Sequence, residues 1–86
     1  TILFNIREEF DRKAHGDIQG ARALPLREIS PKRLPTNPNT PIMFICQTGS
    51  RASSAARQAI AWGYSNVISV QGGFQRWKRA NLPVVP

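Results

Sequence analysis

The residues best suited to chemistry lie in one short stretch around the single cysteine of the chain. Cys46 ends an apolar run. Five residues follow it and lead into a segment with helical spacing: they are Gln47, Thr48, Gly49, Ser50 and Arg51. A thiol that faces a helix N-terminus meets the positive end of the helix dipole and unpaired backbone N–H groups, both of which favour the thiolate. The same N–H groups can hold an anion or a negatively charged sulfur, and the guanidinium fork of Arg51 can hold an oxyanion. We therefore predict a nucleophilic Cys46 at the base of a small anion-binding loop.

The flanking segments predict alternating strands and helices. We expect strands at 1–6, within 18–26, at 42–46 and at 66–70, helices at 7–15, 51–62 and 74–80, and a proline-rich surface loop at 31–41. This alternation is typical of βαβ units in an α/β domain, with a mainly parallel sheet and helices on both faces. Ligands of such sheets bind beyond the carboxyl ends of the strands, and Cys46 lies at one of these ends.

Apolar side chains indicate which helix faces point to the core. One predicted helix carries an apolar stripe with helical spacing, Ala52, Ala55, Ala56, Ala59 and Ile60. In the first helix, Phe10 is expected to pin an otherwise polar segment to the core. Phe74 and Trp77 are expected to be core anchors rather than a platform for stacking.

Length, composition and charge exclude several kinds of protein. The 86 residues suit one domain, 1–86. A single cysteine cannot form a disulfide within the chain. With only one cysteine and one histidine, we expect neither a metal site nor a cofactor. No apolar run is long enough to span a membrane and no signal peptide is visible. Residues 29–86 carry seven basic residues and no acid, a net +7, which favours anions. The bases are scattered without interleaved aromatics, so nucleic acid is not an expected partner.

Several segments in this order and spacing resemble the rhodanese family of sulfurtransferases over nearly the whole chain. They are Ile6-Arg7-Glu8-Glu9-Phe10, the stretch Gly16 to Ala21, the loop Cys46 to Arg51, Gly63 to Val67, and an ending with Gly72-Gly73-Phe74, Trp77, Ala80 and Leu82-Pro83-Val84. The resemblance implies a rhodanese-like three-layer fold that lacks the first strand and helix of the family, which leaves one sheet edge open to an adjoining domain or subunit.

The resemblance also implies a mechanism. Cys46 would take a sulfane sulfur from an anionic donor such as thiosulfate, or from a persulfide, and pass it to cyanide, a thiol or a protein acceptor. The amides of residues 47–51 would stabilise the persulfide, and Arg51 would hold the oxyanion of the donor. Because a reactive thiol suits a reducing compartment, we expect a cytoplasmic protein. The alternative is a non-catalytic rhodanese-like interaction or sensor module of a larger protein.

Two comparisons with the family pattern sharpen these expectations. The related cell-cycle phosphatases have five residues between cysteine and arginine, whereas four separate Cys46 from Arg51, which suits sulfur better than phosphate. Asn5 stands where the family usually has aspartate, and Asp17 stands where it commonly has histidine. A negative charge at Asp17 would disfavour the thiolate of Cys46 if the carboxylate pointed toward the sulfur.

Overall fold

The strands of the computed structural model form one parallel sheet. The structure describes residues 2–18, 20–47, 50–70 and 72–79. In chain order the strands are β1 (Ile2–Asn5), β2 (Arg22–Ala23), β3 (Ile42–Ile45) and β4 (Val67–Ser69), and they pair in the order β2-β1-β3-β4. Every pairing among them is parallel, with Phe4 beside Phe44 and Phe44 beside Ser69. Their carboxyl ends therefore share one edge of the sheet.

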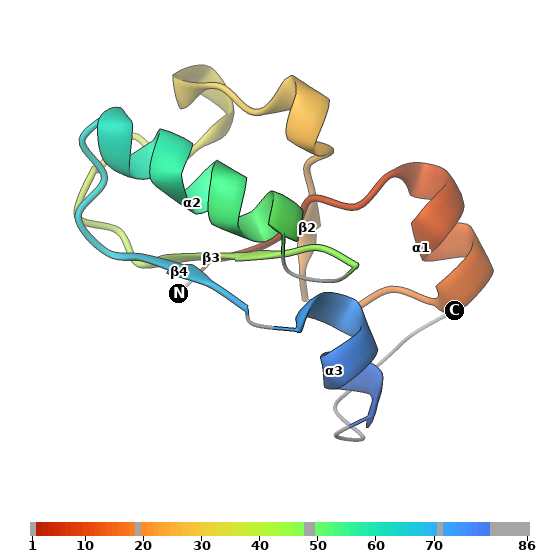
Figure 1. Ribbon diagram of the computed structural model, residues 1–86. Coiled ribbons are helices and arrows are strands. Elements are labelled where there is room, and N and C mark those ends of the chain that lie inside the picture. The colour runs from red at the N-terminus through yellow and green to blue at the C-terminus, as the bar shows by residue number, and fades with distance from the viewer. Residues whose placement is uncertain (1, 19, 48–49, 71, 80–86) are drawn as a thin grey trace.

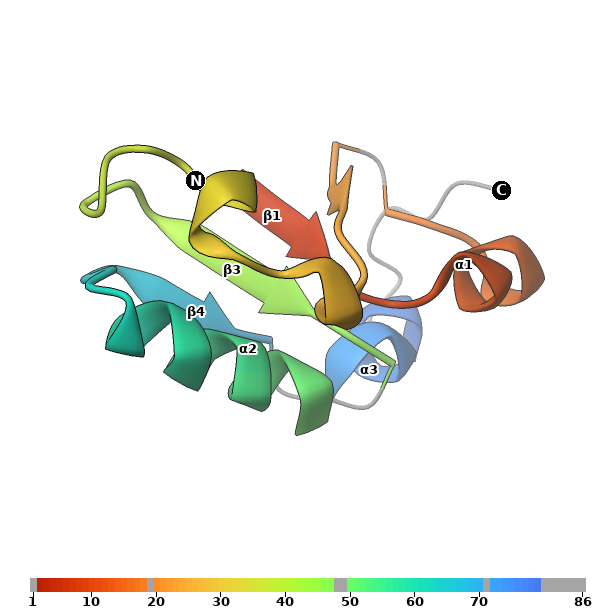
Figure 2. The same cartoon turned by 90° about the horizontal axis from the view of Figure 1, so that it is seen from above.

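Helices lie on both faces of this sheet, as the sequence predicted. They are α1 (Glu9–His15), α2 (Ser50–Ala61) and α3 (Gly73–Arg79), with two short 3-10 helices, η1 (Leu26–Glu28) and η2 (Pro31–Arg33). Figure 1 shows α2 along one face and α3 below the other. Seen from above, α1 and α3 both lie beyond the carboxyl ends of the strands (Figure 2). The end of β3 is thus surrounded by all three α-helices.

The main core lies between α2 and the sheet. The buried face of α2 carries only small side chains, so the helix packs closely against β3 and β4. These residues are Ala52, Ala55, Ala56 and Ala59. Beneath them the rings of Phe4 and Phe44 stack with centroids 5.8 Å apart. The prediction that Ile60 belongs to this stripe is wrong, because its side chain is 57% exposed. At about 100° per residue, Ile60 lies roughly 80° around the helix from Ala52, beyond the buried face.

A smaller core on the opposite face holds α3 against the sheet. Ile45 and Phe74 are buried there, and Trp77 packs against them, so the expected core role of the two aromatics is confirmed. Leu3 packs against this core and stands in a row with Met43 and Ile68 on the neighbouring strands β3 and β4. Ile68 is 50% exposed, so this row of apolar side chains is only partly covered.

The remaining differences from the predicted elements are small. The segment expected to be a loop contains η2, and the hydroxyl of Tyr64 donates a hydrogen bond to the Pro35 carbonyl within it. The expected strand 66–70 is shorter, Val67–Ser69. Gly16 ends α1 as predicted, with a φ of 93° that suits glycine.

Candidate active site

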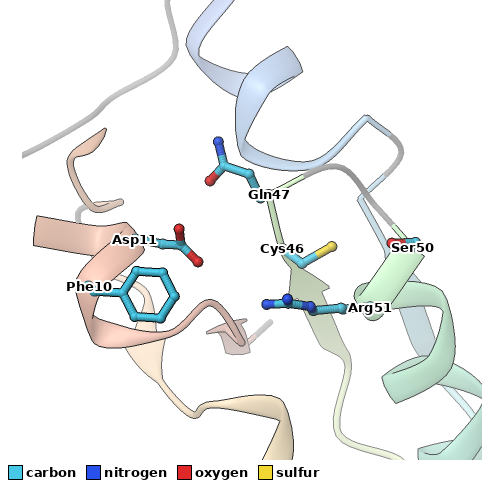
Figure 3. A pocket seen from close by; sticks show the side chains of 6 residues that line it. All are labelled: Phe10, Asp11, Cys46, Gln47, Ser50 and Arg51. Carbon is cyan, nitrogen blue, oxygen red and sulfur yellow. The ribbon is translucent and has the colours of Figure 1, made fainter. Parts of the chain in front are cut away.

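Cys46 follows β3 directly and its sulfur lies at the start of α2. The side chain is buried, and its Sγ accepts a hydrogen bond of 3.3 Å from the backbone N–H of Ala52 in the first turn of that helix. Figure 3 shows the sulfur directed toward the N-terminal turn of α2. The start of α2 therefore places a backbone N–H donor beside the Cys46 sulfur.

A pocket of about 320 Å³ opens beside Cys46. Its walls are formed by six residues, Phe10, Asp11, Cys46, Gln47, Ser50 and Arg51. Four of the six predicted site residues are therefore brought together, while Thr48 and Gly49 lie outside the described residues. The Arg51 side chain is largely exposed and extends from α2 across the pocket (Figure 3). The arrangement offers a sulfur nucleophile and a cation to one small ligand.

The other wall of the pocket comes from α1, which the site prediction did not include. Phe10 was expected to pin this surface helix, but it is 69% exposed and lines the pocket beside Asp11. A signal was available in the order of the elements: the segments that follow neighbouring parallel strands β1 and β3 must meet at the same edge. On that basis, Phe10 and Asp11 could have been placed near Cys46 from the sequence.

Arg7, rather than Phe10, fixes α1 beside the sheet. Its fully buried guanidinium donates to the Gln47 side-chain oxygen at 3.0 Å and to the backbone carbonyls of Gly16 and Asp11, each at 2.9 Å. The same group lies 3.8 Å from the ring centroid of Phe74. Burial lowers the pKa of Arg7 from its ordinary value, and the charges of Asp11 and Asp17 oppose that shift. One side chain thus joins both ends of α1, the Cys46 loop and α3.

The two positions that depart from the family pattern contact each other. The amide of Asn5 donates to Asp17 at 2.8 Å, and the backbone N–H of Ile18 donates to the same carboxylate oxygen. Arg12 pairs with the other oxygen at 3.3 Å. Burial alone would raise the pKa of Asp17, but these hydrogen bonds and the Arg12 charge outweigh it and lower the pKa. The carboxylate is thus engaged outside the residues that line the Cys46 pocket.

The first turn of α3 holds the backbone at the base of the loop. The N–H of Phe74 donates to the Cys46 carbonyl at 2.6 Å, and that of Gln75 donates to the Gln47 carbonyl at 3.2 Å. Gly73 makes this approach possible, since an added Cβ would overlap the Cys46 carbonyl oxygen and lie 2.8 Å from the Gln47 carbonyl atoms. Its φ of 57° also favours glycine.

Neither a membrane-spanning helix nor a metal-binding cluster is found in the described part of the chain. None of its helices is long and apolar enough to cross a bilayer. Within the same residues, no three side chains of histidine, cysteine, aspartate or glutamate gather where they could hold a metal ion.

Comparisons with known proteins agree with this geometry. The model of the rhodanese-like domain matches residues 1–80. Thiosulfate sulfurtransferase GlpE of Pseudomonas putida (strain GB-1) is 37% identical over 83 residues, which are 96% of this chain and 74% of that protein. An uncharacterized protein of Synechocystis sp. is 32% identical over 85 residues. That match covers 99% of this chain and 47% of the relative, so the chain spans about half of its length.

Solved structures give the same result for the fold. The crystal structure of a rhodanese-related protein from Thermoplasma volcanium superposes with a TM-score of 0.84 at 28% sequence identity. The superposition covers 98% of this chain and 82% of that one. The parallel sheet and its helices are therefore an arrangement that an experimentally determined relative shares.

Proposed function

This chain belongs to the rhodanese-like domain family, and from that premise we propose that it transfers sulfane sulfur through a persulfide on Cys46. The observation that carries the proposal is the hydrogen bond from the Ala52 N–H to Cys46 Sγ at the base of an open pocket. It places a backbone donor beside the proposed sulfur nucleophile, and the adjoining pocket gives a small molecule access to Cys46. The similarity to a thiosulfate sulfurtransferase supports thiosulfate as a donor.

The first half-reaction consumes the donor. The Cys46 thiolate attacks the outer sulfur of thiosulfate, a new S–S bond forms, and the bond to the sulfonate sulfur breaks with its electron pair leaving on sulfite. Arg51 is the cation available for the sulfonate oxygens, because its side chain lines the same pocket as the sulfur. The persulfide then carries its negative charge near the first turn of α2, where backbone amides stabilise it.

The second half-reaction returns the enzyme to its starting state. Cyanide, a thiolate or a protein acceptor attacks the outer sulfur of the persulfide, and the electron pair of the broken bond returns to Cys46 Sγ. No outside oxidant or reductant is needed, since the sulfane sulfur moves between two nucleophiles. The chemistry suits a reducing compartment, so the cytoplasm is the proposed location.

Intact mass spectrometry tests this proposal directly. Incubation with thiosulfate should add one sulfur, about 32 Da, to the chain, and cyanide should remove it as thiocyanate. Cys46→Ser is the control, because a hydroxyl forms no persulfide, and circular dichroism checks that the variant folds. A folded wild-type protein that gains no mass from thiosulfate, or a Cys46→Ser protein that still transfers sulfur, would contradict the proposal.

The second candidate is an interaction module without catalysis. The partly exposed apolar row of Leu3, Met43 and Ile68 favours it, since an uncovered sheet face can bind an adjoining domain or subunit. The same mass experiment separates the two candidates. A chain that never acquires sulfur but whose partner binding is lost on Ile68→Ser would be a module.

A further inference from the structure

The Cys46 pocket presents two opposite charges to its ligand. Figure 3 shows Asp11 and Phe10, from α1, facing Cys46 and Arg51 from across the pocket. In the described residues, neither the Asp11 carboxylate nor the Arg51 guanidinium takes part in a hydrogen bond or an ion pair. An acid and a base that line one pocket without pairing with each other are both available to a ligand.

Asp11 is poorly explained as a counterion for Arg7 alone. The Asp11 charge does raise the pKa of Arg7 against the effect of burial. However, each hydrogen bond that the structure gives the Arg7 guanidinium goes to an uncharged oxygen, and the Asp11 oxygen among them is its backbone carbonyl. The carboxylate is left on the pocket side, where it opposes the binding of a doubly negative donor such as thiosulfate.

The size of the pocket also exceeds what an inorganic donor needs. A volume of about 320 Å³ falls within the range of pockets that bind small organic molecules, about 300–1,000 Å³. Thiosulfate has only five heavy atoms, so room remains for an organic group. The exposed ring of Phe10 offers that group an apolar surface between the two charges.

We propose, building on the sulfurtransferase function above, that the acceptor is an α-amino thiol of the cysteine type. Its ammonium group binds Asp11, its carboxylate binds Arg51, and its sulfur reaches Cys46. A single tetrahedral carbon directs these three groups apart, which matches a pocket lined by an acid from α1, a base from α2 and Cys46 at the end of β3. Arg51 thus serves the donor in one half-reaction and the acceptor in the other.

The transfer step balances without a further reactant. The acceptor thiolate attacks the outer sulfur of the Cys46 persulfide and forms a new S–S bond. The bond between that sulfur and Cys46 Sγ breaks, and its electron pair stays on Sγ as the thiolate. Any proton on the outer sulfur moves with it, and the product is an amino-acid persulfide.

Three acceptors separate the contribution of each charge. Cysteine carries both groups, 3-mercaptopropionate lacks the ammonium, and cysteamine lacks the carboxylate. The persulfide form is prepared with thiosulfate and desalted, and its loss of sulfur is followed by intact mass at equal thiolate concentrations. In the wild type, the second-order rate constant should be highest for cysteine.

Asp11→Asn removes the charge and keeps the shape of the side chain. Transfer to cysteine and to cysteamine should fall about three- to tenfold, as expected for a partly exposed ion pair, while transfer to 3-mercaptopropionate should not fall. Glu9→Gln is the matched control, since it removes a carboxylate from the same helix outside this pocket. It should leave all three rate constants unchanged.

A binding measurement makes the test independent of sulfur loading. S-methylcysteine cannot accept sulfur, but at millimolar concentrations it should slow the alkylation of Cys46 by iodoacetamide in the wild type and less so in Asp11→Asn. If the protein acquires sulfur but Asp11→Asn keeps the wild-type preference for cysteine over 3-mercaptopropionate, the acceptor assignment is wrong and the sulfurtransferase function stands. If the protein acquires no sulfur from thiosulfate, the proposed sulfurtransferase function is wrong. If S-methylcysteine protects Cys46 equally in the wild type and in Asp11→Asn, the proposed role of Asp11 is wrong.

Discussion

The amide of Asn5 donates a hydrogen bond of 2.8 Å to the carboxylate of Asp17, which links the two positions where this chain departs from the rhodanese pattern. Asn5 is the last residue of β1, whereas Asp17 lies in the segment after α1, where Arg12 pairs with it. The hydrogen bond between Asn5 and Asp17 therefore joins β1 to the segment after α1. The negative charge of Asp17 is paired with Arg12, and neither residue lines the Cys46 pocket.

Asp17→Asn should change how stability depends on pH. The pKa of Asp17 in the folded protein lies below its ordinary value of 3.8, so the ionised carboxylate stabilises the fold. This contribution is complete above about pH 4 and is lost as the pH falls through the folded pKa. Urea unfolding from about pH 7 to about pH 3 should show a loss of about 1–2 kcal/mol at neutral pH in the variant and a shallower decline in acid. Parallel curves for the two proteins would exclude this role.

Arg51→Ala should weaken the use of thiosulfate without unfolding the protein. The side chain is exposed, and an anion contact of a guanidinium contributes about 1–3 kcal/mol, so KM should rise roughly 5- to 150-fold. Steady-state kinetics over a range of thiosulfate concentrations measure the change. Arg57→Ala is the control, because it removes an exposed charge from the same helix outside the pocket. Equal effects of the two substitutions would assign the result to net charge instead of to Arg51.

Arg7→Lys should destabilise the fold although it preserves the charge. A lysine cannot reproduce three hydrogen bonds from one planar group to Gln47, Gly16 and Asp11, and it leaves buried oxygens unpaired. We expect the free energy of unfolding to fall by about 2–3 kcal/mol in urea titrations. Arg22→Lys, at an exposed position of β2, should change it little. Equal stability of the two variants would show that the charge alone is sufficient at position 7.

Gly73→Ala should be more damaging than the same change at Gly20. Both glycines have positive φ angles, which alone cost an alanine about 1 kcal/mol. At Gly73 the new methyl group also meets the carbonyls of Cys46 and Gln47, whereas nothing lies within 4 Å of that position at Gly20. Thermal unfolding should therefore show a loss of more than about 2 kcal/mol for Gly73→Ala. A loss no greater than that of Gly20→Ala would contradict the packing argument.

The elements of the fold could largely be predicted from the sequence because hydrophobic periodicity determines them. The alanine face of α2 and the apolar β3 run produce strong local patterns, and both are buried as expected. Ile60 was misplaced because the pattern does not show where the sheet beneath the helix ends. Phe10 was misplaced for a related reason: an aromatic at helical spacing indicates the core only when a core lies beneath it.

The site could be predicted only in part. The loop from Cys46 is continuous in sequence, so local spacing was enough to propose its residues. Asp11 enters the pocket through tertiary structure, because the buried Arg7 holds α1 beside the loop. A buried arginine is hard to infer from sequence, since arginine is usually exposed and its partners here are two backbone carbonyls and an amide.

The contact between α3 and the Cys46 loop makes the geometry of the loop a property of the folded chain as a whole. The carbonyls of Cys46 and Gln47 are held by amides of Phe74 and Gln75, far away in sequence, so the orientation of these peptide units depends on the docking of the last helix. A synthetic peptide with the sequence of the loop would lack both of these backbone contacts. Any event that undocks α3 would release these two carbonyls while leaving every residue of the pocket chemically intact.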